Sequence, residues 1–163
     1  MFTRVFSMQI QEWSDIDLAY LAGFVDGEGA VYISRHVARR KSGKEYVIYE
    51  PTFILANTNL VGLQRIQDKF GGRLYLHNNS HAKPHWKPMY HLRFRYEEMR
   101  QIFPKLIPFL VLKQEQARLT LSWLELRLPM RQRHRSEIDG RILPRPYLDN
   151  ELELFEKIRK LNG

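Results

Sequence analysis

The chain has 163 residues, about the size of one domain, and carries 26 Lys and Arg against 18 Asp and Glu, a net charge of +8. This excess of positive charge predicts a polyanionic partner, and nucleic acid is the leading candidate. The lack of Cys excludes disulfides, zinc fingers and thiol catalysis. No apolar run approaches the roughly 20 residues that span a bilayer, and the N-terminus MFTRVFSMQIQEW does not resemble a secretory signal. We therefore expect a soluble, unexported protein with no membrane partner.

The first predicted helix begins at Ser14, which pairs with Asp17 as a capping box, and continues to Gly27. Its apolar positions follow helical spacing at Ile16, Leu18, Leu21, Ala22 and Val25. Strands are predicted next at 30–39 and 46–56, joined by a turn at 42–43. A helix at 60–70 follows, capped by one of Asn57, Thr58 and Asn59, and then strands at 73–79 and 89–96. Helical sequence begins at 97 and is interrupted by Pro104 and Pro108, and further helices are predicted at 112–128 and 148–161. Up to residue 128 the pattern predicts the order α, ββ, α, ββ, α, α, and the helix at 148–161 follows it.

The nine residues LAGFVDGEG, at 21–29, place three glycines and two carboxylates at the predicted end of the first helix. Gly23 and Gly27 are four residues apart and share a face with Ala19, which favours the close approach of another helix. Glu28 lies beside the unsatisfied carbonyls of the helix end, whose partial negative charge favours a cation. Asp26 points about 200° away from Glu28 around the helix axis. We therefore interpret Glu28 as a metal ligand and Asp26 as a structural residue. The alternative, an ordinary helix end at a glycine, does not explain Gly23.

LAGFVDGEG resembles the motif of the LAGLIDADG homing endonucleases, specifically those with a single motif that act as homodimers. The segment PFLVLKQEQA, at 108–117, is similar to the one in which that family carries a site lysine, here Lys113. The resemblance covers about the first 128 residues. It implies an α+β fold with an αββαββα core over about 14–128 and a saddle-shaped antiparallel sheet, followed by a basic loop and a C-terminal helix over 129–163. The whole of 1–163 would form one LAGLIDADG endonuclease domain.

The resemblance also implies how the site is assembled. Two first helices would pack about a twofold axis, with an interface made by Ala19, Ala22, Gly23, Asp26 and Gly27. Two copies of Glu28, with the carbonyl of Gly27, would then hold Mg²⁺, for which Mn²⁺ could substitute; no organic cofactor is expected. The family usually has Asp at the position of Glu28. Lys113 would supply positive charge to the transition state or orient water, and Asn57 would either hold a water at the metal site or cap the following helix.

Strand alternation divides the predicted sheet into two faces. One face, with Val31, Ile33, Val37, Tyr49, Phe53 and Leu55, should meet the helices. The other is polar, basic and aromatic, and a β-ribbon of this kind fits the major groove of DNA, while the basic hairpin tip suits phosphates. The predicted DNA-contacting residues are Tyr32, Ser34, His36, Arg39, Arg40, Lys41, Lys44, Ile48, Glu50, Thr52, Ile54, Ala56, Tyr75, His77, Asn79, His91, Arg93 and Arg95, with Arg133, Arg135 and Arg141 from the basic loop. The alternative for any one of these residues is a solvated polar side chain.

The function that these features and the resemblance imply is a site-specific homing endonuclease. A homodimer would make a double-strand break with 3′ overhangs in a long, pseudo-palindromic DNA site by metal-dependent phosphodiester hydrolysis, and would thereby promote intron mobility. It would be located wherever its DNA target resides. The alternatives are an intron maturase or a DNA-binding regulator on the same fold without cleavage. A generic RNA-binding domain would need a recognised arrangement of stacking aromatics, which we do not find.

Overall fold

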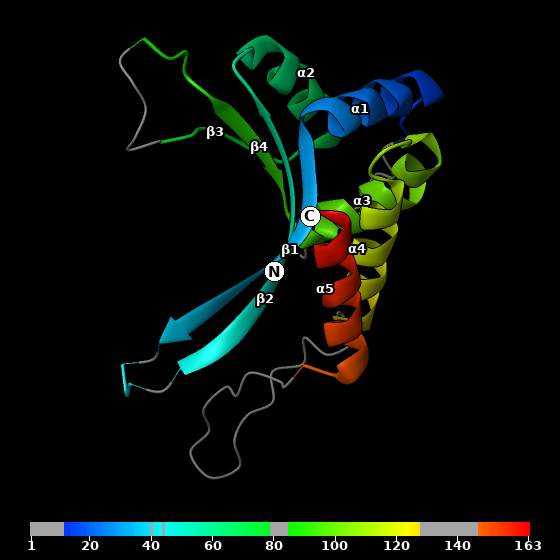
Figure 1. Cartoon of the computed structure of the whole chain (residues 1–163). Coiled ribbons are helices and arrows are strands. Elements are labelled where there is room, and N and C mark those ends of the chain that lie inside the picture. Colours follow the sequence, from blue (N-terminus) through cyan, green and yellow to red (C-terminus); the bar gives the residue numbers. More distant parts are fainter. Residues whose placement is uncertain (1–11, 40, 44, 79–84, 128–146) are drawn as a thin grey trace, which may run out of the picture.

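The computed structural model describes residues 12–39, 41–43, 45–78, 85–127 and 147–163. Its elements are, in chain order, α1 (Asp15–Glu28), β1 (Gly29–Arg39), β2 (Glu45–Asn57), α2 (Leu60–Phe70), β3 (Arg73–Leu76), β4 (Tyr90–Phe94), α3 (Tyr96–Leu106), the 3₁₀ turn η1 (Ile107–Phe109), α4 (Gln114–Arg127) and α5 (Asp149–Leu161). Figure 1 shows the strands as a curved sheet with α3, α4 and α5 gathered along one side. The predicted α+β class and element order are confirmed.

The four strands form one antiparallel sheet in the order β1-β2-β4-β3. Residues directly opposite each other in an antiparallel pair share a face of the sheet. Phe53 is opposite Val31 in β1 and Phe94 in β4, so these three side chains lie on the same face. The Phe53 and Phe94 rings stack with their centroids 4.5 Å apart. Phe53 also lies 5.1 Å from the ring of Phe103 on α3. These side chains are buried, and the hydrophobic core therefore lies between this face of the sheet and the helices.

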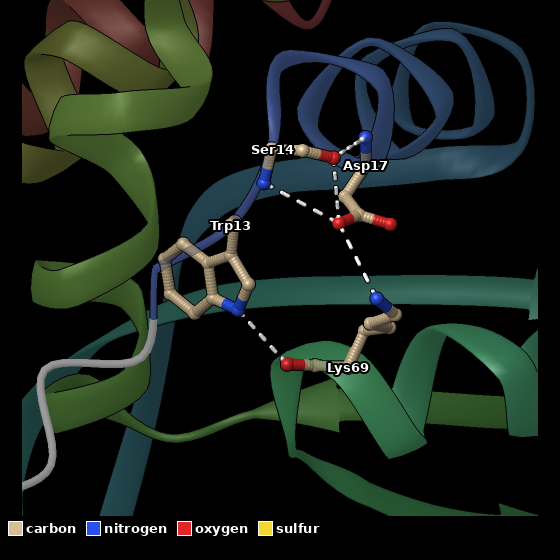
Figure 2. Close-up of polar contacts among 4 residues, drawn as sticks. All are labelled: Trp13, Ser14, Asp17 and Lys69. Atoms are coloured by element: carbon tan, nitrogen blue, oxygen red, sulfur yellow. Dashed lines mark hydrogen bonds and ion pairs between the residues drawn. The ribbon is translucent and has the colours of Figure 1, made fainter.

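The start of α1 is attached to the end of α2 by the cluster in Figure 2. Ser14 caps α1 by accepting the N–H of Asp17 and donates its hydroxyl to the Asp17 carboxylate, which lowers the pKa of that carboxyl group. Lys69 pairs with the same carboxylate at 3.4 Å. The indole N–H of Trp13 donates to the carbonyl of Lys69 at 2.9 Å. Because α1 carries the LAGFVDGEG motif, this cluster sets the position of the motif relative to α2.

The buried carboxylate of Glu151 holds the N-terminal end of α5 in place. Glu151 has no exposed surface; its carboxylate lies 3.3 Å from Arg127 at the end of α4 and accepts the N–H of Leu148 at 2.7 Å. The Arg127 guanidinium lies over the ring of Tyr147, 4.1 Å from its centroid. The hydroxyl of Tyr147 accepts the backbone N–H of Tyr49 at 2.9 Å. α5 is therefore connected to both α4 and β2.

The structure corrects the prediction for Pro104 and the predicted lengths of the third and fourth strands. Pro104 does not interrupt α3 but lies inside it, where both Pro104 and Arg100 are exposed, so water can satisfy the carbonyl that loses its helical donor. The third and fourth strands are shorter than predicted, and Arg95 and Tyr96, which we placed in the fourth strand, are the N-cap and the first residue of α3. His77 follows directly after β3.

Two apolar residues of the predicted pattern are exposed: Ile16, which follows the helical spacing of α1, and Val37, which we placed towards the helices. Ile16 has 82% of its surface exposed on α1, and Val37 has 52% exposed on β1. Val37 lies towards the outer end of the β1–β2 hairpin, which extends beyond the helices in Figure 1. No helix in the described part of the chain is long and apolar enough to cross a membrane.

Candidate active site and nucleic-acid interface

The LAGFVDGEG motif spans the junction at which α1 passes directly into β1. Glu28 is the last residue of the helix and is exposed, and Gly29 opens the strand with extended backbone angles. A Cβ at Gly29 would lie 2.7 Å from the carbonyl oxygen of Val25, too close for any side chain. The last glycine of the motif is therefore required by the sharp change from helix to strand, and this change places the Glu28 carboxylate at the junction of α1 and the sheet.

Asp26 and Lys113 close the end of α1 from both sides. The Asp26 carboxylate accepts the backbone N–H groups of Val111, at 2.8 Å, and Lys113, at 3.0 Å. The Lys113 ammonium donates to the carbonyls of Val25, at 2.9 Å, and Asp26, at 2.7 Å. A positive charge here stabilises the negative end of the helix dipole. The hydrogen bonds of Asp26 are structural, as we expected, but they are made within one chain and not across an interface. Lys113 lies just before α4 and not within a helix that begins at 112.

Asn57 is the last residue of β2, and its side-chain oxygen accepts the N–H of Asn59 at 2.8 Å. The N-cap of α2 is Asn59, whose side chain accepts the N–H of Gly62 at 3.3 Å. Of the two alternatives for Asn57, the N-cap is therefore wrong, because that position falls two residues later. The polar turn 57–59 predicts a cap, but only the end of β2 decides which residue provides it.

Glu28 stands without a cluster of other acidic or histidine side chains among the described residues. Among the described residues, no group of three or more His, Asp and Glu side chains could hold a metal ion. A carboxylate and a backbone carbonyl are oxygen donors of the kind that Mg²⁺ prefers. Exposed Glu28 and the carbonyl of Gly27 therefore fit such an ion in chemistry, and water or phosphate oxygens could supply further ligands.

α1 presents a stripe of exposed small and apolar residues, which we call the α1 stripe: Ile16, Ala19, Tyr20, Gly23 and Gly27. Their spacing of three and four residues places them on one face of the helix. A Cβ at Gly23 or Gly27 would meet nothing within 4 Å, so this face is open in the single chain. Ala22, by contrast, is 2% exposed and packs in the core, so its assignment to an interface is wrong.

The sheet face turned away from the core gathers most of the predicted DNA-contacting residues. Direct pairing in the three strand ladders places these residues, which we call the open face, on one side of the sheet: Ala30, Tyr32, Ser34, His36, Ala38, Tyr46, Ile48, Glu50, Thr52, Ile54, Ala56, Arg73, Tyr75, His91 and Arg93. Arg73 was missed by the sequence analysis although it is opposite Arg93; alternation along its strand could have found it. Arg39 and Lys41 are exposed at the hairpin tip. Arg40, Lys44, Asn79, Arg133, Arg135 and Arg141 lie outside the described residues.

Thr52 does not fit the prediction of an accessible DNA contact. It lies on the open face but is only 4% exposed, whereas Tyr32, directly opposite it in β1, is 37% exposed. The short threonine side chain lies between longer ones on the same face and cannot reach past them. Sequence alternation identifies a residue's face, but the height of its neighbours decides whether it is accessible.

The open face carries two polar clusters, the second of which includes His77, the residue after β3. Arg93 pairs with Glu50 across the sheet, with 2.9 Å between Nη2 and Oε1. At the β3–β4 end, the rings of His77 and His91 stack with their centroids 4.2 Å apart, and Tyr75 meets His91 edge-on at 5.6 Å. Burial, and to a lesser extent the charge of His77, lower the pKa of His91. Donors, acceptors and aromatic rings are thus presented together on one concave, accessible surface.

No protein-family model and no curated protein matches the sequence. Solved structures do match the fold. The homing endonuclease I-CvuI, in complex with its target in the presence of Ca, matches with a TM-score of 0.56 and 22% identity over 90% of this chain and 95% of its own. The group I intron-encoded homing endonuclease I-CeuI, complexed with DNA, gives 0.59 and 18% over 91% of this chain and 69% of its own. The LAGLIDADG meganuclease I-CpaMI, bound to uncleaved DNA, gives 0.54 and 19% over 92% of this chain and 50% of its own.

The chain therefore has the fold of the LAGLIDADG homing endonucleases. The likeness of fold agrees with the resemblance that LAGFVDGEG and PFLVLKQEQA carry in the sequence.

Proposed function

We propose that this protein is a LAGLIDADG homing endonuclease that cleaves double-stranded DNA as a homodimer. The observation that carries the proposal is the position of Glu28. This exposed carboxylate ends the same helix that presents the α1 stripe, at the junction with a sheet whose open face is polar and basic. A partner on the stripe and DNA on the open face would therefore both lie next to Glu28.

The glycines of the α1 stripe support a symmetric dimer. Two copies of α1 can approach closely at Gly23 and Gly27, where neither chain has a side chain to separate the helix backbones. Ile16 and Tyr20 would add apolar area towards the other end of the helix. The twofold axis would bring two copies of Glu28 together.

The metal site would be formed by the Glu28 carboxylates and Gly27 carbonyls of both chains, holding Mg²⁺ or, as a substitute, Mn²⁺. When bound, such an ion activates water for attack and stabilises charge on the phosphate. The chain's own residues would position these groups. Lys113 and Asp26 hold the end of α1 by the hydrogen bonds described above. The side chain of Asn57, at the neighbouring end of β2, would orient a water.

The open face would lie in the major groove, with Tyr32, His36 and Arg93 among the groups that reach base edges. Arg39 and Lys41 would contact phosphates from the hairpin tip. A symmetric dimer would read a long pseudo-palindromic site, cut both strands to leave 3′ overhangs and promote the mobility of its intron. The DNA complexes of the structural neighbours I-CvuI and I-CeuI support a double-stranded DNA partner.

A cleavage assay tests the proposal directly. Duplex DNA spanning the intronless insertion point is incubated with the protein and Mg²⁺, beside Glu28→Gln and, as a matched control, Glu125→Gln, which changes an exposed acid on α4. The parent protein and Glu125→Gln should cleave, while Glu28→Gln should bind the same DNA without cleaving it. Tight binding without cleavage by the parent protein would contradict the nuclease and favour a regulator or maturase. Cleavage by Glu28→Gln would contradict only the proposed role of Glu28 as a metal ligand.

A further inference from the structure

Glu50 is the only acidic residue that the described strand ladders place on the open face. A carboxylate on a surface that faces DNA repels the phosphates and weakens binding. Its position in the middle of β2, opposite Ser34, leaves it half-buried among face residues and far from the strand ends. An acid in this position calls for a reason other than general solubility.

Arg93 supplies that reason. Its guanidinium Nη2 lies 2.9 Å from Oε1 of Glu50, and the two side chains keep 40% and 36% of their surfaces exposed. In the β2–β4 ladder Arg93 faces Ile54, four residues beyond Glu50. The two side chains therefore extend towards each other along β2 to make this pair.

A second arginine, Arg73, favours an Arg93 side chain that points away from β3. Arg73 on β3 is directly opposite Arg93, and like charges in a directly opposed pair repel. Glu50 attracts Arg93 towards β2, on the side away from Arg73. Glu50 thus fixes the arginine in one direction and offsets one of two neighbouring positive charges.

We propose that Glu50 is a positioning residue for Arg93, and that Arg93, held in this way, selects guanine at one base position in each half of the DNA target. The inference rests on the proposed function, because it requires DNA on the open face. A guanidinium has five N–H donors in a planar fork, so the carboxylate at Nη2 leaves enough donors for O6 and N7 of guanine. Fixing the plane of the fork restricts the geometry in which those donors can meet a base.

The test uses selection from a randomised duplex DNA library, so that the target need not be known. The wild-type protein should enrich a symmetric consensus with a guanine in each half. Arg93→Ala should reduce the preference for that guanine about tenfold, the effect of losing one bidentate base contact. Glu50→Ala should reduce the preference at the same position, while total DNA affinity stays equal or rises because a negative charge is gone. Glu50→Gln, which can still accept a hydrogen bond from Arg93, should restore part of the preference.

Two controls separate positioning from direct reading. The double variant should discriminate as Arg93→Ala alone does, because Glu50 acts only through Arg93. Glu45→Ala, which changes an exposed acid on β2 outside the open face, should leave the consensus unchanged. A consensus unchanged in Glu50→Ala, or one altered at a position that Arg93→Ala leaves alone, would overturn the inference; the second result would mean that Glu50 reads a base itself. Failure of the wild-type protein to enrich any consensus would overturn the proposed DNA recognition together with the inference.

Discussion

Asp26 and Lys113, 87 residues apart in the chain, are bonded to each other in both directions. The N–H of Lys113 donates to the Asp26 carboxylate at 3.0 Å, and the Lys113 ammonium donates back to the Asp26 carbonyl at 2.7 Å. Lys113 thereby closes the end of α1, and Asp26 holds the segment before α4. The position of Glu28, two residues after Asp26, depends on this pair.

Replacing the Asp26 side chain should destabilise the fold. Asp26→Ala leaves the N–H groups of Val111 and Lys113 without their charged acceptor, so we expect the free energy of unfolding to fall by about 2 kcal/mol. Urea denaturation measures the change. Asp68→Ala, which alters an exposed acid on α2, should stay within about 0.5 kcal/mol of the wild type. Equal stability of Asp26→Ala and the wild type would contradict the structural role.

Lys113 should affect stability as well as cleavage. Lys113→Met removes two hydrogen bonds to the carbonyls of Val25 and Asp26 and should lower the free energy of unfolding by about 1–2 kcal/mol, again measured in urea without DNA or metal. Lys113→Arg, which keeps the charge, should recover part of the loss. If Lys113 acts only on the reacting phosphate, Lys113→Met will instead be as stable as the parent protein.

The two motif glycines Gly23 and Gly29 should respond oppositely to one added methyl group. Gly23→Ala meets open space on the α1 stripe and should stabilise the single chain by up to about 1 kcal/mol, because alanine is the better helix former. Gly29→Ala should destabilise it, since its Cβ would lie 2.7 Å from the Val25 carbonyl oxygen. Thermal unfolding compares the two.

A larger residue at the same stripe position tests the dimer. Gly23→Trp should leave the fold intact and shift the protein from dimer to monomer in sedimentation experiments, because the bulky ring prevents close helix approach. A dimer that persists in Gly23→Trp at the affinity of the parent would exclude the α1 stripe as its interface.

The buried acid Glu151 should contribute more to stability than its exposed neighbour. Glu151→Ala leaves Arg127 and the N–H of Leu148 without their acceptor inside the α4–α5 contact, and we expect a loss of about 3 kcal/mol. Glu153→Ala removes an exposed acid from the same helix and should change the free energy of unfolding by less than about 0.5 kcal/mol. Equal losses in denaturant for the two variants would show that burial of Glu151 is unimportant.

His91 should make the fold less stable in mild acid. Its pKa in the folded chain is lower than the ordinary value of 6.5, so the unfolded chain binds the proton more readily. The stability due to the neutral imidazole is therefore present above pH 6.5 and is lost as the pH falls below it. Unfolding at pH 7.5 and 5.0 should show a smaller loss for His91→Gln than for the wild type. The same pH dependence in both proteins would contradict this assignment.

Local patterns predicted most of the elements and their faces. Ser14 and Asp17 form the capping box that their spacing indicates, and alternation put Phe53 and Leu55 on the core side of the sheet. Both relationships involve residues within a few positions of each other, where backbone geometry alone decides which side chains meet. Ile16 follows the helical spacing of α1 and is nevertheless exposed, because helical periodicity marks an apolar face without showing whether the same chain covers it.

The sequence by itself determined the LAGFVDGEG junction, the helical spacing of its glycines and the polar face of the strands. Only the tertiary structure decided that Lys113 closes α1, that Arg93 reaches Glu50, and that Thr52 and Ala22 are buried. The physical reason is that these outcomes depend on which strands are neighbours and in what register, and on the height of the side chains around each residue. Alternation along one strand specifies a face, but β4 had to pair with β2 before Arg93 and Glu50 could meet.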